Sequence, residues 1–335
     1  MHRSGPTLTA GRTPAPDRST GPTTSTAAAT GPPAISVTGL TKRYGPRTVV
    51  DAFDLEVPRG VVAGFVGPNG AGKTTTMSML LGLVRPSAGT GTVLGEPLTD
   101  PATYLRRVGA MVEGPAFYPS LSGRRNLAMF ATIGRHDPAS VDRVLDVVGL
   151  ADRADDRYRS YSLGMKQRLG IAAALLGDPE LLVLDEPANG LDPQGVREMR
   201  ALIGAVAGRG RTVLVSSHDL SELEQLCDWL VLIDTGRSLY QGPADALLDA
   251  DGSDLTVRPA AADQLDRLQQ VLADRDLRST RDGDRLVLRS VADPAAVAAA
   301  VNRTAFDAGI TLVELVPART SLEDRYLSLV EGATP

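Results

Sequence analysis

Apolar residues along this chain gather in short runs that predict buried strands. The clearest runs cover residues 61–66, 181–184 and 212–215. Runs of this length without polar alternation are typical of strands in a parallel sheet that is covered on both faces. Shorter apolar segments at residues 35–37, 48–50, 53–57, 230–234 and 238–240 predict further strands around this core.

Helical spacing dominates the middle of the chain. Between residues 140 and 150 the apolar positions Val141, Val144, Leu145 and Val148 follow the i, i+3, i+4, i+7 pattern of a helix face. Other helices are predicted near residues 122, 169–176 and 194–206. Because the stretch of about 115–177 is helical rather than alternating strand and helix, we expect an inserted helical subdomain there.

A different order of elements begins at residue 254. A strand at 255–257, a helix at 260–272, two short strands around an Asp-Gly-Asp turn, a helix at 294–308 and a strand at 311–316 are predicted. This β-α-β-β-α-β order is that of a ferredoxin-like domain. With a last helix at 321–330, we assign residues 254–335 to an accessory domain that follows a linker at 243–253.

Composition informs the disorder, partners, cellular compartment and membrane spans expected of this chain. Residues 1–33 consist almost wholly of Gly, Pro, Ser, Thr and Ala, so we predict a disordered tail. The net charge of −5, without a basic block, predicts no nucleic-acid partner. The single cysteine, Cys227, excludes an internal disulfide and fits a reducing cytosol. No apolar run approaches the roughly 18 residues that span a bilayer.

A glycine-rich loop follows the strand at 61–66 and precedes a predicted helix. It fits the pattern G-x-x-x-x-G-K-[ST] and consists of Gly67, Pro68, Asn69, Gly70, Ala71, Gly72, Lys73, Thr74 and Thr75. Glycines let backbone N–H groups approach phosphates, and the helix N-terminus adds its positive dipole end. Lys73 is expected to reach the outer phosphates and Thr74 to ligate Mg²⁺. The loop therefore predicts a nucleoside triphosphate site.

Two adjacent carboxylates follow the predicted strand at 181–184. Ligands bind at the carboxyl ends of strands in sheets of this kind. We expect Asp185 to hold Mg²⁺ and Glu186 to accept a proton from, or orient, an attacking water. The strand that begins at Thr212 ends on His218, which lies in line with these carboxylates and is a candidate phosphate contact.

Two further features allow a functional and a structural interpretation. Ser162 and Gly164 begin an apolar helix, and they suit either a second anion site or an ordinary capped helix. Tyr44 lies upstream of the glycine loop, and its ring suits either base stacking or a half-buried strand end.

Taken in order, these motifs resemble the nucleotide-binding subunit of an ABC transporter over about residues 34–242. The resemblance makes residues 67–75 a Walker A loop, 181–186 a Walker B strand with Glu186 catalytic, and 162–167 a signature motif. It also makes Asp192 part of a D-loop, His218 the switch histidine, and Tyr44 the base-stacking aromatic.

Two positions depart from the usual family pattern. The signature LSGGQ is replaced by Tyr161-Ser162-Leu163-Gly164-Met165, which keeps the serine and the second glycine. The loop glutamine is replaced by Glu113, a carboxylate that can ligate Mg²⁺ but cannot donate a hydrogen bond. Both features resemble a drug and peptide-antibiotic exporter branch that includes bacitracin-type and lantibiotic-immunity transporters.

The resemblance implies a fold and a set of partners. The fold is an α/β P-loop NTPase cassette, with a RecA-like core, an antiparallel β subdomain and the helical insertion, followed by the small α+β ferredoxin-like domain. The implied ligands are ATP and Mg²⁺. The implied partners are a second copy of this chain and a separately encoded membrane permease, which places the chain in the cytoplasm on the inner face of the membrane. The alternative is a soluble ABC ATPase that acts on ribosomes or DNA.

Overall fold

The computed structural model describes residues 31–114, 116–249, 253–291, 293–318 and 321–333. Most of the tail predicted at 1–33 lies outside these ranges. Among the described residues, no helix is both long and apolar enough to cross a membrane.

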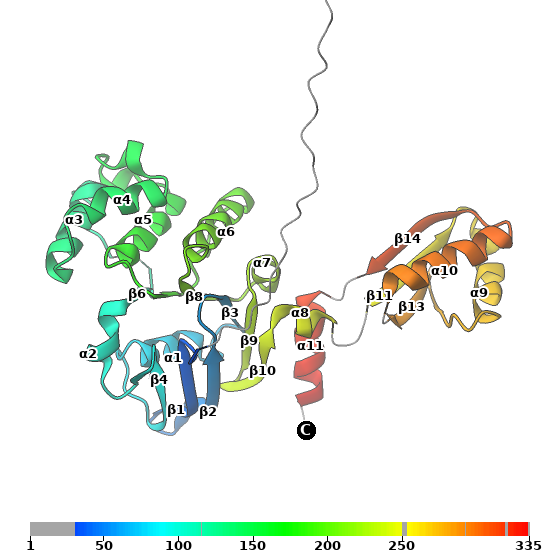
Figure 1. Cartoon of the computed structure of the whole chain (residues 1–335), viewed down its shortest axis with the longest axis horizontal. Coiled ribbons are helices and arrows are strands. Elements are labelled where there is room, and N and C mark those ends of the chain that lie inside the picture. The colour runs from blue at the N-terminus through cyan, green and yellow to red at the C-terminus, as the bar shows by residue number, and fades with distance from the viewer. Residues whose placement is uncertain (1–30, 115, 250–252, 292, 319–320, 334–335) are drawn as a thin grey trace, which may run out of the picture. The chain divides into compact units, whose positions relative to one another are not determined.

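A six-stranded sheet carries the motifs (Figure 1). Its order is β10-β9-β3-β8-β7-β6, and only β10 runs antiparallel to its neighbour. The strands are β3 (Val62–Val66), β6 (Val108–Met111), β7 (Leu181–Leu184), β8 (Thr212–Ser217), β9 (Trp229–Asp234) and β10 (Arg237–Pro243). The prediction of a parallel core sheet is therefore confirmed.

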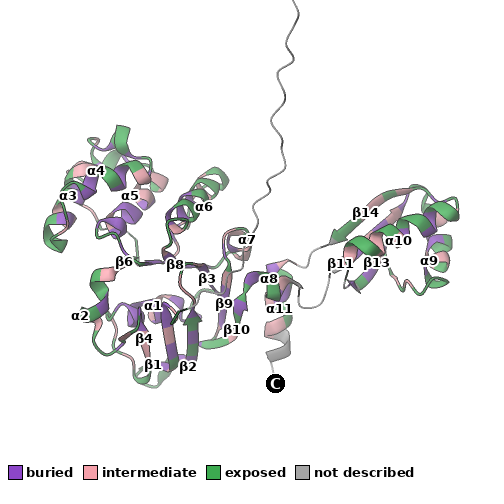
Figure 2. Cartoon of the chain, viewed as in Figure 1, coloured by how far each residue is buried: buried purple, intermediate pink, exposed green. Residues whose placement is uncertain are grey.

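The apolar runs have no polar alternation because each face of this sheet meets its own core. In β7, Leu182 and Leu184 pack into one core and Leu181 and Val183 into the other. Successive side chains of a strand point to opposite faces, so both sets must be apolar. Figure 2 shows these strands as mostly buried, whereas helices such as α6 present exposed outer surfaces.

One core lies under a second, antiparallel sheet of order β2-β1-β4-β5. Its strands are β1 (Ile35–Tyr44), β2 (Arg47–Val57), β4 (Ala88–Val93) and β5 (Glu96–Pro97). The two strands expected at 48–50 and 53–57 form one strand instead. Ala52 adopts a positive φ of 45° inside β2, and this irregularity interrupts the alternation that the sequence pattern follows.

The described part of the cassette also contains helices from α1 to α8. They are α1 (Lys73–Leu80), α2 (Pro101–Tyr104), α3 (Gly123–Gly134), α4 (Ser140–Val147), α5 (Leu163–Leu175), α6 (Pro193–Ala207), α7 (Leu220–Glu224) and α8 (Ala244–Asp249), with 3₁₀ turns at Leu105–Arg107, Ala151–Arg153 and Tyr158–Ser160. Helices α3, α4 and α5 fall within the predicted helical subdomain and pack through Leu127, Leu145 and Leu169.

The accessory region has its own sheet and core. It contains β11 (Ser253–Pro259), a 3₁₀ turn (Ala262–Gln264), α9 (Leu265–Ala273), β12 (Thr280–Asp282), β13 (Arg285–Val291), α10 (Pro294–Asp307) and β14 (Leu312–Ala318). The antiparallel order β12-β13-β11-β14 is that of a ferredoxin-like sheet, as the element order predicts.

The last helix, α11 (Leu322–Ala333), does not belong to this second core. Leu322 is fully buried in the core of the cassette, and Tyr326 and Leu329 pack against the same core. The backbone N–H of Leu322 donates to Glu224 of α7 at 3.3 Å. The range 254–335 therefore contains a ferredoxin-like unit and a returning helix that the apolar spacing did not separate.

Candidate nucleotide-binding and catalytic site

The glycine loop joins β3 to α1 in a conformation that needs glycine. Gly72 precedes α1 with a φ of 107°, a region that side chains disfavour. A Cβ atom on Gly67 would lie 2.2 Å from the carbonyl oxygen of Ile233. No side chain caps α1, so the N–H groups of its first turn depend on a ligand or on solvent. This geometry suits an anion.

Lys73 is the buried cation of the loop. Its side chain is 6% exposed, and its Nζ donates to the carbonyl oxygen of Gly67 at 2.6 Å. The same Nζ lies 3.4 Å from Glu186 Oε1. The Nζ also donates to the carbonyl oxygen of Pro68 at 3.4 Å. Two of these three contacts are long, and phosphate oxygens can replace them because an ammonium group carries three donors.

Thr74 and Asp185 form the candidate Mg²⁺ site. The Thr74 hydroxyl donates to Asp185 Oδ2 at 2.7 Å, and the Ser216 hydroxyl donates to Asp185 Oδ1. Within the described residues, no group of three or more His, Cys, Asp and Glu side chains forms a metal cluster. Mg²⁺ in phosphotransfer sites uses one or two carboxylates together with phosphate oxygens and water. One hydroxyl and one carboxylate therefore fit Mg²⁺ bound together with a triphosphate.

Glu186 and His218 lie in direct contact at the ends of β7 and β8. His218 Nδ1 is 2.7 Å from Glu186 Oε2. The backbone N–H of Glu186 donates to the Ser216 hydroxyl at 2.9 Å, and its φ is 50°. A left-handed φ costs about 1–2 kcal/mol in a residue other than glycine. Ser216 therefore helps to hold Glu186 in a conformation that the chain disfavours.

Helix α7 begins two residues after His218, close to the end of β8. Asp219 caps this helix by accepting the N–H of Ser221 at 2.9 Å, and hydrogen bonds from Ser221 lower the pKa of Asp219. Glu222 accepts the Ser217 hydroxyl at 3.3 Å. Burial, followed by the nearby charge of Asp219, raises the pKa of Glu222. Asp219 thus caps α7, and Glu222 ties α7 to the end of β8.

The loop, Glu186 and His218 line one cleft of about 470 Å³. Its lining is Arg47, Val49, Pro68, Asn69, Gly70, Gly72, Lys73, Thr74, Thr75, Glu186, Asn189 and His218. Of the predicted site residues, Gly67, Ala71 and Asp185 lie behind this surface, where they shape the loop or hold Thr74. Motifs far apart in the sequence therefore meet at one edge of the sheet.

A second hollow, of about 570 Å³, holds the remaining predicted residues. Ser162, Gly164 and Asp192 line it together. Ser162 caps α5 by accepting the N–H of Met165 at 3.3 Å, and Asp192 caps α6 by accepting the N–H of Gly195 at 2.8 Å. A Cβ on Gly164 would meet only Leu191, at 3.7 Å. The linings of the two hollows share no residue.

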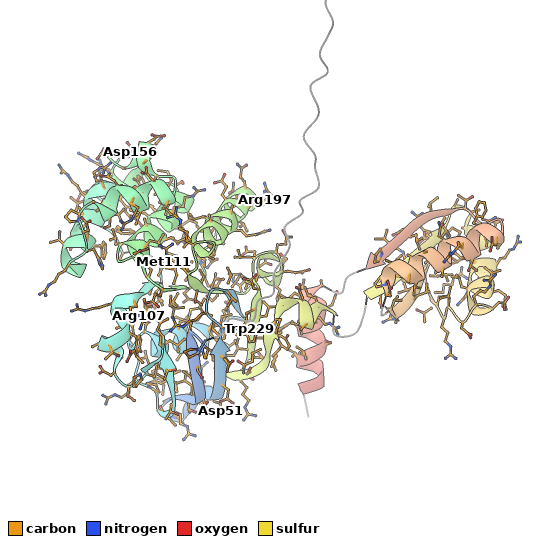
Figure 3. The ribbon with its side chains drawn as sticks, in the orientation of Figure 1. Asp51, Arg107, Met111, Asp156, Arg197 and Trp229 are labelled. Atoms are coloured by element: carbon orange, nitrogen blue, oxygen red, sulfur yellow. The ribbon has the colours of Figure 1, made fainter. Side chains whose placement is uncertain are left out.

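Two predicted residues lie apart from both hollows. Tyr44 ends β1 with 51% of its surface exposed, and Lys42 Nζ lies 4.8 Å from its ring centroid. Glu113 is exposed, with a φ of 59°, two residues beyond Met111, which ends β6 and is labelled in Figure 3. The carbonyl oxygen of Met111 accepts the N–H of Asp185 at 2.8 Å. Base stacking by Tyr44 and Mg²⁺ ligation by Glu113 stay predictions.

Sequence reasoning missed Ser216 and Arg47. Ser216 is fully buried at the second-to-last position of an apolar strand. A buried hydroxyl in that position needs a partner, which is the signal that points to it. Arg47 lies in a polar segment and carries no local signal, because only the hairpin fold brings it to the cleft.

A phosphate loop beside a strand that ends in Asp-Glu defines a P-loop nucleoside triphosphatase. The ABC transporter family model matches residues 50–189. A bacitracin transport ATP-binding protein is 41% identical to this chain over 90% of its residues. The chain therefore belongs to the ABC transporter ATP-binding proteins, a family that binds and hydrolyses ATP.

The bacitracin transport ATP-binding protein BcrA of Bacillus licheniformis is 41% identical, over 90% of this chain and 98% of its own length. The daunorubicin resistance ATP-binding protein DrrA3 of Streptomyces coeruleorubidus is 38% identical, over 88% and 95%. The Nod factor export ATP-binding protein I of Cupriavidus metallidurans is 36% identical, over 88% and 96%. These matches confirm the exporter branch that the signature indicates, and they do not support the ribosome- or DNA-acting alternative.

Solved structures agree with the fold of the cassette. The ATP-binding subunit of an ABC transporter superposes with a TM-score of 0.58 at 30% identity, over 65% of this chain and 92% of that chain. The cbiO1 protein of Clostridium perfringens, part of the transporter complex cbiONQ, superposes with the same score at 25% identity, over 65% and 91%.

Proposed function

We propose that this chain is the ATP-hydrolysing subunit of an exporter that works as a homodimer. Each ATP is bound by the phosphate loop of one copy and by the signature serine and glycine of the other. Closure of the dimer acts on a separately encoded membrane permease, at the cytoplasmic face of the membrane. The cargo class is a drug, an antibiotic or a lipid-like molecule.

The observation that carries this proposal is the division of the predicted site between two hollows. Lys73 and Glu186 belong to one hollow, and Ser162 and Gly164 belong to the other. One copy thus presents two incomplete surfaces for a phosphate chain. An isologous pairing, in which the two copies are related by twofold symmetry, completes both sites at once.

The residues of the first hollow suit hydrolysis of the bound nucleotide. Loop N–H groups and Lys73 bind the phosphates, and Glu186 orients the attacking water and accepts its proton. His218 hydrogen-bonds Glu186 and holds the carboxylate toward the cleft. Thr74 and Asp185 are the residues that would hold Mg²⁺, which when bound would supply positive charge against the phosphate oxygens. Closure is favoured because ATP contacts both copies only in the closed state.

The proposals about export, the cargo and the permease rest on the relatives of this chain. The names of three relatives concern bacitracin transport, daunorubicin resistance and Nod factor export. Those cargoes differ in chemistry, which supports a cargo selected by the permease rather than by this chain. Peripheral attachment to the membrane follows from the same proposed partner.

Glu186→Gln tests the proposal. The amide keeps the size of the carboxylate but cannot accept the proton, so we expect turnover to fall by about 10²–10⁴-fold. MgATP should then accumulate a dimer that light scattering detects. Glu56→Gln is the matched control, because Glu56 is an exposed residue of β2 outside the cleft. Near-normal turnover of Glu186→Gln, or a monomer at saturating MgATP, would contradict the proposal.

A further inference from the structure

Arg47 enters the nucleotide cleft from the β1–β2 hairpin. Tyr44 and Arg47 are direct cross-strand partners on either side of the two-residue turn Gly45-Pro46. Directly opposite residues of an antiparallel pair extend their side chains on the same face. Arg47 lines the cleft with Lys73, Thr74 and Thr75, so this face of the hairpin forms one wall of it.

The other charged groups of the cleft already have partners. Lys73 lies 3.4 Å from Glu186, and His218 contacts the second oxygen of the same carboxylate. Thr74 donates to Asp185. Across the part of the chain that the structure describes, no carboxylate or carbonyl forms a hydrogen bond or an ion pair with the Arg47 guanidinium. Arg47 is therefore a cation in the cleft without a counter-charge from the protein.

Neighbouring groups of the hairpin do not supply that counter-charge. Asp51, on the same strand and labelled in Figure 3, pairs with Arg237 at 2.8 Å. Lys42, on the opposite strand, lies over the ring of Tyr44 and donates to the carbonyl oxygen of Arg85 at 2.8 Å. An arginine in a concave surface with phosphate-binding N–H groups is suited to a phosphate, because its planar fork of donors matches phosphate oxygens.

We propose that Arg47 binds the phosphate chain of ATP from the hairpin side of the cleft that it shares with Lys73. This inference rests on the proposed function and adds a cationic contact outside the recognised motifs. Its contribution differs from that of Lys73, because Lys73 is buried under the loop whereas Arg47 is exposed. Arg47 therefore strengthens nucleotide binding without being required for the fold of the loop, and salt screens its contribution.

Equilibrium binding of MgATP and MgADP, measured by calorimetry, tests this role. Arg47→Ala should raise both dissociation constants by about tenfold, as expected for one charge-assisted hydrogen bond at a solvent-facing site. Arg47→Lys should restore part of the affinity, since it keeps the charge and loses the fork. The dissociation constant of the wild type should rise more steeply with NaCl than that of Arg47→Ala.

Arg43→Ala is the matched control. Arg43 is an exposed arginine one position before Tyr44, paired with Thr48 on the other face of the hairpin. Its removal should leave both dissociation constants unchanged. Arg47→Gln provides a second variant that keeps a polar side chain, and equal melting temperatures without nucleotide show that the hairpin is intact.

The outcomes separate the inference from the proposed function. If the wild type binds MgATP and the folded Arg47→Ala and Arg47→Gln variants bind it equally well, with the same salt dependence, Arg47 is not a phosphate contact. If Arg43→Ala weakens binding as much as Arg47→Ala, the effect is one of general surface charge, and the inference is wrong. Failure of the wild type to bind MgATP contradicts the proposed function itself.

Discussion

Two helices of this cassette begin at predicted phosphate sites, and they begin in different ways. Helix α1 starts after Gly72, a glycine at a positive φ, and no side chain caps it. Helix α5 starts after Ser162, whose hydroxyl accepts the N–H of Met165. Lys73, the first residue of α1, is buried, whereas Leu163, the first residue of α5, is 46% exposed. The N–H groups of the first start depend on a ligand or on solvent, whereas a side chain already satisfies one N–H group of the second.

This difference separates a primary site from a secondary one. The α1 start presents several unsatisfied N–H groups beside a buried cation, so it can hold a triphosphate within one copy of the chain. The α5 start offers a hydroxyl and an open glycine to a group that another molecule supplies. Under the proposed function, we therefore expect ATP to bind at the α1 start before a second copy closes on it with its α5 start.

The largest effect is expected at the α1 start. Lys73→Ala removes the buried cation and should weaken MgATP binding by about 100-fold or more, because charge-assisted phosphate contacts in a buried site are strong. Lys73→Met, which keeps the apolar stem of the side chain, should show the same loss with less change in stability. Binding is measured by calorimetry, and unaltered affinity in both variants would overturn the assignment of the loop.

At the α5 start, Ser162→Arg should abolish the ATP-dependent dimer and leave binding to the monomer unchanged. The new side chain fills the hollow that the partner's nucleotide requires, and this hollow shares no residue with the Lys73 cleft. The test is light scattering of Glu186→Gln with and without Ser162→Arg. An unchanged dimer, or a monomer that no longer binds MgATP, would show that the two starts are not separate half-sites.

A smaller effect is expected when only the cap of α5 is removed. Ser162→Ala should cost about 1 kcal/mol, typical of a lost N-cap, and lower the melting temperature by about 2–4 °C. Ser122 caps α3 in the same way, by accepting the N–H of Arg125. Ser122→Ala should give the same thermal loss but keep the ATP-dependent dimer, whereas Ser162→Ala should weaken that dimer. Equal dimerisation of the two variants would leave Ser162 with a capping role alone.

The smallest effect concerns Glu113, which lies beside neither start. If it joins the Mg²⁺ shell in the closed dimer, Glu113→Gln should raise the Mg²⁺ concentration for half-maximal ATPase activity by about two- to fivefold, through loss of one anionic ligand. Glu96→Gln, in β5, is the control. ATPase activity and transport that both stay unaltered would exclude Glu113 from the metal shell.

The sequence indicated most of the first site because its chemistry is local. A loop that holds phosphate needs glycines, a lysine and a hydroxyl within nine residues, so the motif is readable without the fold. The buried strands were readable for a similar reason, since both faces of the sheet meet apolar cores. The returning helix α11 was not separated from the accessory domain, because apolar spacing shows that a helix has a buried face but does not show which core receives it.

The sequence by itself determined the phosphate loop, the carboxylates of the adjacent strand, the class of fold and the order of elements in the accessory domain. Only the tertiary structure decided that Ser216 supports both Asp185 and Glu186, that Arg47 lines the cleft, and that Ser162 and Gly164 lie in a separate hollow. The physical reason is the distance along the sequence over which each feature is set. Backbone conformation and buried periodicity are set by neighbours along the chain, whereas the meeting of side chains from distant strands depends on how the sheet is assembled.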